Sequence, residues 1–528
     1  MTELTGTLQL LRLNLRRDRI RIGIWIASIV ALVAVTVPSI KTLFPTQAAL
    51  DQAAAASQNN AAAIAFNGPA QGLNSVGGQV AFQLGAGGMV LVALMSLFMM
   101  GRLTRGEEEA GRVELLRSLP VGRHASTMAA LVTLTAMNLA VGGLTFIALL
   151  AQGLSTVGSL VFGASFIVVG LFFAAVALLA AQITENTRAV YGSAGAVLGA
   201  AYVMRAVGDI GDGTLSWFSP IGLAQKTRPF VGERWWPLLP LLAFVVLLIG
   251  AAIVLAARRD HGAGLVAPQP GRSTASPSLG NPIGLAVRLQ RGTLIGWGIG
   301  VAVGGIAYGW IAPTVDSFIA QNKQLAEMMA SAGGASLIDS YFATSFRIMA
   351  LIATGFAIQS ALRLRGEETA MRAESVLATP ISRLRWAASH LTVACAGCVV
   401  LLAVAGLSTG MSYVAGGGAW SSVPRLLGAA LVYAPAMWLM VGLTFAIFGL
   451  VPRLVDVAWA VFAACFLIGF LAVILKIPDW VQRLSPFERI PQLPAEHLTV
   501  LPLIVISAIA AGFILVGLGG LQRRDVGY

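Results

Sequence analysis

The sequence predicts an all-α integral membrane protein with twelve transmembrane helices arranged in two related halves. Three observations lead to this prediction. Of the 528 residues, 57% are hydrophobic and only 11% are charged. Several apolar stretches approach or exceed the ~20 residues that a helix needs to cross the hydrocarbon layer, a length that a soluble core does not require. A charged segment of 19 residues also occurs twice, which indicates an internal duplication.

The twelve spans follow from the apolar stretches taken in chain order. Gly-rich breaks near Gly153–Gly158 and Gly416–Gly418 are expected to form turns between spans. The predicted spans lie near 22–44, 84–103, 126–153, 156–181, 189–207, 236–257, 293–312, 343–362, 386–414, 424–449, 455–475 and 499–521.

The basic residues predict the orientation of the chain in the cell membrane. When both termini are placed in the cytoplasm, most of the 35 basic residues fall in cytoplasmic segments, which is the positive-inside bias. This bias accounts for the net charge of +12 without nucleic acid. No polar segment interleaves basic and aromatic residues, so the sequence argues against nucleic-acid binding. The first apolar run is too long for the core of a cleaved signal peptide, so it is expected to be a structural span.

The charged segment reads RGEEEAGRVELLRSLPVGR at 105–123 and RGEETAMRAESVLATPISR at 365–383. The copies align without a gap at an offset of 260 and share nine residues. Other motifs recur as well, namely Arg16, Arg19 and Trp25 as Arg288, Arg291 and Trp297, and Ser219-Pro220 as Ser485-Pro486. We therefore predict halves at 1–265 and 283–528, joined by a linker at 266–282 that is rich in Pro, Ser and Gly. An even number of spans in each half makes the repeats parallel, with a substrate route expected on the axis between them.

Each half is expected to open with an amphipathic helix in the inner membrane interface. Leu4, Leu8, Leu11 and Leu15 form a helical stripe, which is flanked by Arg12, Arg16 and Arg19. A shorter version, from Leu285 to Arg291, carries Arg288 and Arg291. The alternative is a solvated tail, but a helix that leads directly into a span favours the interface.

The two charged segments, here called the charged islands, are predicted to be short helices. Glu108 and Arg112 are four residues apart, as are Glu368 and Arg372, which suits ion pairs on one helix face. Pro120 and Pro380 are expected to end these helices. An ordinary solvated loop is the alternative, but it does not explain why the same acids recur in both halves.

These motifs are familiar. The pattern E-E-x-x-G-x-x-E-L-L-x-x-L-P-V-x-R between the second and third spans resembles the coupling helix of ABC-2 type permeases. The helix before the first span and the outer Ser-Pro motif before the sixth span also look like features of that family. The closest resemblance, over essentially the full chain, is to actinobacterial permeases of the polyketide-antibiotic (tetronasin-type) exporter class. The second island departs from the pattern, because Met371 and Ser375-Val376 replace Gly111 and Leu115-Leu116.

The resemblance implies an exporter whose ATPase is a separate polypeptide, which binds ATP and Mg and supplies two nucleotide-binding domains per chain. The implied coupling residues are Arg105, Glu107, Glu108, Arg112, Glu114, Leu115, Leu116, Arg365, Glu367, Glu368, Arg372, Glu374 and Val376. The family would place the substrate pathway along the second and fifth spans of each half. Those spans carry Met95, Phe98, Met99, Tyr202, Phe346, Met349, Phe356, Gln359, Trp459, Phe462 and Phe466, which ordinary lipid-facing or core packing also explains.

The chain itself shows no sign of an enzyme or a cofactor site. A P-loop requires a lysine after glycine, and none of Lys41, Lys226, Lys323 and Lys476 follows one. Cys395, Cys398 and Cys465 lie in apolar spans and are expected to be packing residues. No cluster of His, Cys and acids has the spacing of a metal site, so no metal is expected.

Two arginines fall inside predicted spans. Arg205 and Arg347 lie toward the outer ends of their spans and lack a basic counterpart in the other half. An intramembrane charge marks a functional site by default. The interpretation favoured by their position is that both side chains extend to the outer interface.

We therefore expect a permease subunit that exports hydrophobic compounds such as antibiotics, drugs or lipid-like molecules. The alternatives are an ion-coupled multidrug antiporter, which would be expected to carry acids within its spans, and a membrane enzyme. An adjacent gene for a P-loop ATPase would favour the exporter, and an isolated gene the antiporter.

Overall fold

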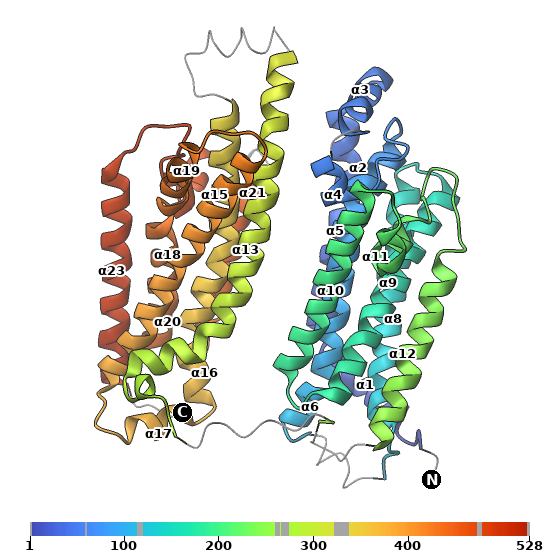
Figure 1. Ribbon diagram of the computed structural model, residues 1–528. Coiled ribbons are helices and arrows are strands. Elements are labelled where there is room, and N and C mark those ends of the chain that lie inside the picture. The colour runs from blue at the N-terminus through green and yellow to red at the C-terminus, as the bar shows by residue number, and fades with distance from the viewer. Residues whose placement is uncertain are drawn as a thin grey trace. The chain divides into compact units, whose positions relative to one another are not determined.

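The computed structural model describes residues 3–58, 61–112, 120–258, 264–265, 274–321, 337–471 and 478–524. The secondary structure of these residues consists of α-helices and short 3-10 turns, without a strand. The chain forms two compact units, Met1–Gly271 and Arg272–Tyr528, whose helices run side by side within each unit (Figure 1). The boundary lies within the segment 266–282, and the permease character assigned to each half remains a prediction.

The first unit begins with α1 (Thr7–Arg17), from which α2 (Arg19–Leu43) is separated by Asp18. Its remaining helices are α3 (Gln47–Gln58), α4 (Ala61–Asn67), α5 (Val76–Leu103), α6 (Arg105–Glu109), α8 (Ala125–Ala151), α9 (Thr156–Ile183), α10 (Thr187–Ile210), η1 (Leu215–Phe218), α11 (Pro220–Gln225) and α12 (Leu238–Arg258).

The second unit begins with η2 (Pro277–Gly280) and the long helix α13 (Pro282–Gln321). It continues with α15 (Leu337–Ala361), α16 (Arg363–Thr369), α17 (Arg372–Leu377), α18 (Arg383–Ala415), α19 (Ser422–Leu431), α20 (Ala434–Leu450), η3 (Pro452–Leu454), α21 (Val457–Leu471), α22 (Asp479–Gln482), η4 (Pro486–Arg489) and α23 (Val500–Arg523).

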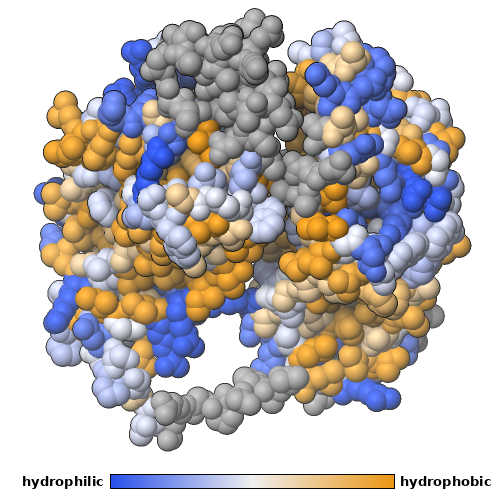
Figure 2. All heavy atoms as spheres, turned by 45° about the horizontal axis from the view of Figure 1, so that its top comes forward, coloured by the Kyte–Doolittle hydropathy of each residue, from blue (hydrophilic) through white to orange (hydrophobic). Residues whose placement is uncertain are grey.

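Twelve helical segments of the described chain are long and apolar enough to cross a membrane, and each coincides with one predicted span. The predicted number of spans is therefore confirmed. Their outward faces are strongly apolar, as Phe244, Val246 and Leu247 of α12 show with exposed fractions of 54%, 68% and 66%. Figure 2 shows hydrophobic residues gathered over the sides of the units. Surfaces of this kind require an apolar solvent, which the bilayer provides.

Three boundaries differ from prediction, each for a local reason. The second span begins at Val76 rather than near 84, because the Ser75 side chain accepts a hydrogen bond from the backbone amide of Gly78 and caps the helix. The tenth span consists of two helices, α19 and α20, because Pro435 occupies the first turn of α20. The segment Leu285–Arg291 is not a separate helix, since α13 runs through it without a break.

The core of each unit surrounds its second and fourth spans. In the first unit, α5 and α9 are the most buried spans, and in the second unit the same is true of α15 and the pair α19–α20. The first and last spans of each unit are the most exposed together with the fifth. This order puts small and aromatic residues at the centre, including Gly88 against Phe166 and Gly397 against Phe356.

Helices α20 and α23 approach so closely that their backbones touch. A Cβ on Gly449 would overlap the carbonyl oxygen of Gly517, and one on Gly520 would lie 2.7 Å from the carbonyl oxygen of Gly449. Glycine at these positions removes the side chains that would hold the helices apart, as in other close helix pairs in membranes.

This contact yields a testable prediction. Gly449→Ala should lower the free energy of unfolding by ~1–3 kcal/mol, because the new methyl group forces the two backbones apart. Gly512→Ala on the same helix pair is the control, since a Cβ there meets nothing within 4 Å. The thermal transitions of both variants in detergent provide the measurement, and equal transitions would contradict the packing described here.

Candidate functional site

The first charged island follows directly from α5 and is bound to three other helices. The buried guanidinium of Arg105 donates from Nε to the carbonyl oxygen of Ala181, at 2.6 Å, in the last turn of α9. The carboxylate of Glu109 accepts from the backbone amide and hydroxyl of Thr187, at 2.7 and 2.8 Å, in the first turn of α10. A cation at a helix C-terminus and an anion at a helix N-terminus are both favourable. The island is thus held rigidly against the ends of two spans.

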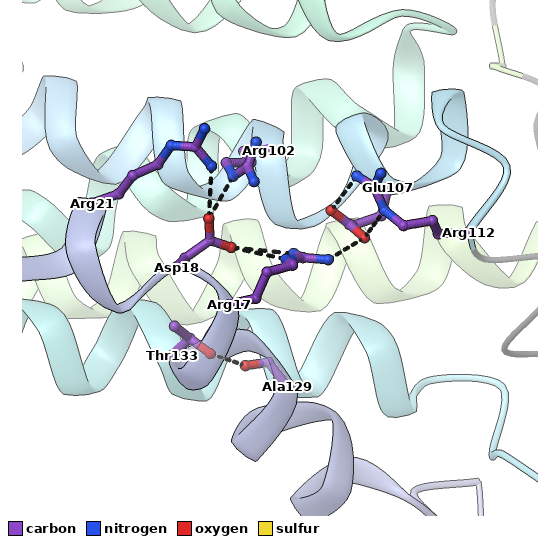
Figure 3. Close-up of polar contacts among 8 residues, drawn as sticks. All are labelled: Arg17, Asp18, Arg21, Arg102, Glu107, Arg112, Ala129 and Thr133. Carbon is purple, nitrogen blue, oxygen red and sulfur yellow. Dashed lines mark hydrogen bonds and ion pairs between the residues drawn. The ribbon is translucent and has the colours of Figure 1, made fainter.

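Glu107 and Arg112 form the central ion pair of this island. The carboxylate of Glu107 accepts from Nε and NH2 of Arg112 at 2.8 and 2.9 Å, and from NH1 of Arg17 at 2.7 Å (Figure 3). The Glu107 hydrogen bond raises the pKa of Arg112 above its usual value. The predicted pair between Glu108 and Arg112 is wrong, because Glu108 accepts from Arg105 at 2.7 Å.

The reason is a turn at Gly111. Its φ of 67° lies in the left-handed region, which ends α6 and turns Arg112 back over the start of the island. The i,i+4 spacing therefore does not describe one continuous helix. Glycine adopts this conformation without a steric penalty.

Asp18 anchors the island to the start of the chain. Its buried carboxylate contacts Arg102 at 2.8 Å, Arg21 at 3.0 Å and Arg17 at 3.2 Å (Figure 3). Burial alone would raise the pKa of Asp18, but the hydrogen bonds from Arg102, Arg21 and Arg17 outweigh it and hold the pKa below its usual value. Asp18 is not among the residues that the sequence motifs predict to be functional. A single acid among five arginines in 12–21 was the available signal.

The second island repeats the central pair. Glu367 contacts Arg372 at 2.9 Å and Arg363 at 2.8 Å, and the left-handed residue between the two short helices is Met371, with a φ of 57°. The predicted pair between Glu368 and Arg372 is wrong for the same reason as in the first island. Glu368 instead binds Arg524, with both carboxylate oxygens at 2.8 Å from NH2. Arg365 lies 3.8 Å from Asp456, just before α21.

Further contacts recur at equivalent positions. Arg123 donates to the carbonyl oxygen of Ala257 at 2.7 Å, and Arg383 donates to that of Arg524 at 2.9 Å. Each arginine thereby ties the start of the third span to the end of the sixth. The position equivalent to Asp18, however, is Gln290, which is buried and contacts Nδ1 of His390 at 3.2 Å and the hydroxyl of Ser360. The first unit is held there by charges and the second by neutral groups.

The remaining predicted coupling residues are only partly described. Glu114, Leu115 and Leu116 lie outside the described residues. Glu374 is exposed, whereas Val376 is half-buried against the core of its unit. The role of these side chains in coupling remains a prediction.

The helix α1 packs against the first turn of α8. Leu10 is buried against Ala125 and Ala129. Of the predicted stripe, Leu4, Leu8 and Leu15 are exposed, with fractions of 48%, 57% and 39%, and Leu11 is half-buried. The stripe therefore faces mainly away from the protein. Arg12 and Arg16 are exposed on α1, while Arg19 is the first residue of α2 and belongs to the span; Arg288 and Arg291 are exposed on α13.

The interpretation that Arg205 and Arg347 extend to the interface remains a prediction, but both side chains are paired within the protein, with partners outside the spans. Arg205 is fully buried and donates from NH2 to the carbonyl oxygens of Ala65 and Phe66, at 2.8 and 3.2 Å, at the end of α4. Arg347 binds both carboxylate oxygens of Glu488, at 3.0 and 2.9 Å. Both arginines are held by partners far away in sequence, which a single span does not reveal.

The predicted pathway residues separate into three groups by burial. Met95, Met99, Phe346, Met349 and Phe356 are buried in the cores of their units. Tyr202, Phe462 and Phe466 are half-buried, whereas Phe98, Gln359 and Trp459 are exposed. Phe98 packs edge-on against Tyr191, and Gln359 accepts from the indole of Trp297 at 2.9 Å. Their predicted place on a substrate route remains a prediction.

The twelve apolar helices indicate a multi-pass membrane protein. Comparisons with known proteins show that the chain is related to permeases. A family model described as the multidrug efflux system permease Rv1217c, C-terminal domain, matches residues 279–522. The chain is 39% identical to the multidrug efflux system permease protein Rv1217c of Mycobacterium tuberculosis over 532 residues, which covers 99% of this chain and 95% of that protein. The chain therefore belongs to the family of multidrug efflux system permeases.

The anchor at Asp18 gives a testable prediction. Asp18→Ala should lower the free energy of unfolding by about 3 kcal/mol, at the low end for a broken buried pair because its arginine partners stay partly solvated. Asp51→Ala removes an exposed acid of α3 and serves as the control. The two variants are compared by thermal unfolding in detergent. If they unfold at the same temperature, Asp18 does not hold the island.

Proposed function

We propose that this chain is the membrane-spanning subunit of an ATP-driven exporter of ABC-2 type. It would move hydrophobic compounds, such as antibiotics, drugs or lipid-like molecules, out of the cell. A separate ATPase would bind ATP and Mg and dock on the charged islands. The family relationship to a multidrug efflux permease supports export. The observation that carries the coupling proposal is the recurrence of one rigid ion pair, Glu107–Arg112 and Glu367–Arg372, in both units.

The geometry of the islands supports this role. Glu107 and Glu367 are buried, so each holds its arginine in one orientation. The side chains of Arg112 and Arg372 remain 46% and 58% exposed and leave donors for a partner. A preorganised guanidinium is suited to recognise carboxylates of another protein. Movement of an island would pass directly to α9 and α10 in the first unit, through Arg105 and Glu109.

The secondary antiporter is less well supported. Ion coupling is expected to use titratable acids that are free to exchange ions inside the membrane. In the described spans, Asp209 of α10 lies 3.6 Å from Arg205, and Asp339 of α15 lies 2.7 Å from Arg425. An acid in close contact with an arginine, as Asp339 is, makes a poor ion carrier because the arginine stabilises its charged form, and Asp209 lies in the last turn of α10 rather than within the span.

The first test concerns docking on the second island. Glu374→Arg should weaken co-purification with the neighbouring P-loop ATPase and reduce drug export, because a like-charge contact at an interface costs several kcal/mol. Asp51→Arg reverses the charge of an exposed acid on α3, away from the islands, and is the control. Normal export and co-purification by Glu374→Arg would exclude this part of the docking surface.

In the first island, Leu115→Ala is expected to weaken assembly more than Val376→Ala does in the second. The mass of the purified complex should correspond to one chain with two ATPase subunits.

The second test concerns orientation. In a background without the native cysteines, cysteines placed at Ala110 and Ala370 should escape a membrane-impermeant maleimide in intact cells, because both islands are proposed to face the cytoplasm. Cysteines at Asp212 and Trp420, at the other ends of the spans, should be labelled. All four positions are exposed in the structure, so accessibility from the two sides of the membrane decides the result. Labelling of either island would overturn the proposed orientation.

A further inference from the structure

A polar pocket lies in the first unit at the end of the spans away from the charged island. Its lining comes from the ends of α10 and α11, the loop before α12 and the segment between α4 and α5. Its volume is about 220 Å³. Drug-sized ligands generally occupy pockets of ~300–1,000 Å³, so this one suits a smaller group. Its lining carries charges of both signs. None of its lining residues belongs to the islands or to the predicted substrate pathway.

Three cations are among the residues that line this pocket. They are Lys226, Arg228 and Arg234, and within the described part of the chain none of them has an acid within ion-pair distance. The ammonium of Lys226 lies 4.6 Å from the ring centre of Trp217. Burial lowers the pKa of Lys226, an effect that Asp209 opposes and the like charge of Arg228 reinforces. Three cations without an ion-pair partner among the described residues favour an anion beside them.

Two buried acceptors line the same pocket. Oδ2 of Asp209 lies 3.6 Å from NH1 of Arg205, and Oε1 of Gln225 belongs to a residue that is 9% exposed. Neither oxygen has a hydrogen-bond donor among the described residues. A buried acceptor without a donor is unfavourable, so a ligand that supplies N–H groups would be stabilised here. A divalent cation is disfavoured by the three cationic side chains nearby.

The surroundings of the pocket indicate the membrane interface. Trp217 and Trp236 stack with ring centres 5.2 Å apart, and Trp235 is 45% exposed beside them. Phe218 is 71% exposed on the same turn as Trp217. Exposed tryptophans at the ends of spans mark the level of the lipid headgroups. At this level of the membrane, the headgroup of a phospholipid can supply both an anion and an amine.

We propose that this pocket binds the headgroup of a phospholipid that carries both a phosphate and a primary ammonium group. The phosphate would contact Lys226, Arg228 and Arg234, and the ammonium would donate to Asp209, Gln225 and Asp212. The second unit lacks this set, because the offset that relates Ser219 to Ser485 places Gln492, Pro494 and Val500 at the positions of the three cations. The site is therefore a property of the first unit, and it does not depend on the ATPase partner.

Native mass spectrometry of the purified chain with synthetic lipids of identical acyl chains tests this proposal. Phosphatidylethanolamine should bind about tenfold more tightly than phosphatidylcholine, whose quaternary ammonium cannot donate a hydrogen bond. Lys226→Ala combined with Arg228→Ala should weaken phosphatidylethanolamine binding about tenfold, equivalent to ~1.4 kcal/mol. Arg483→Ala combined with Arg489→Ala removes the same charge from the second unit and should leave binding unchanged.

A second variant addresses the ammonium and does not depend on the folding of the first. Asp212→Asn keeps the oxygen that accepts from the amide of Thr214 at 2.9 Å, and the residue is exposed, so the fold is retained. It should weaken binding of phosphatidylethanolamine but not of phosphatidylglycerol. Equal binding of phosphatidylethanolamine and phosphatidylcholine by the unchanged protein would overturn the proposal. Equal losses in both double variants would show a general charge effect and also overturn it. Displacement of the lipid by inorganic phosphate alone would identify a free anion site instead.

Discussion

A backbone inside a bilayer must satisfy its own hydrogen bonds, and every other feature of this molecule is arranged around that constraint. The spans are therefore continuous helices with apolar outer faces, and the close contacts between them rely on glycine. The contact of Gly449 with Gly517 is the clearest case, because the two backbones meet where any side chain would separate them. Charged and strongly polar groups are then confined to the ends of spans, or must be paired where they are enclosed.

The pairs at the span ends explain how a chain with few charges maintains rigid ends. Asp18 and Glu107 share Arg17, so the start of the chain, the end of α5 and the island form one connected cluster (Figure 3). Arg105 and Glu109 extend this cluster to α9 and α10 by placing charges at the matching helix ends. In the second unit, Glu367 pairs with Arg372 and Arg363, and Glu368 pairs with Arg524. Rigidity supports the coupling role proposed for the islands, since a flexible segment would absorb a partner's movement.

The two units are alike in architecture and different in chemistry. The order of buried and exposed spans is the same in both, and so are the arginine contacts from Arg123 and Arg383 to the end of the sixth span. The buried charge of Asp18 is replaced by the neutral Gln290 with His390 and Ser360, and the cationic pocket around Lys226 has no equivalent residues in the second unit.

The sequence alone was sufficient for the number, order and approximate limits of the spans, because hydrophobic length is a local property. It also identified the duplicated islands, because repeated residues are visible without a fold. It was not sufficient for the contacts of the charges. Arg102 lies 84 residues from Asp18, and Arg205 lies 140 residues from Ala65, so only the packing of helices brings these groups together. The pairing of Arg112 with Glu107 rather than Glu108 depended on a left-handed turn at Gly111, which interrupts the helical spacing on which the prediction rested. Local periodicity determined which segments are helices, and tertiary packing decided which charges are buried and what each of them contacts.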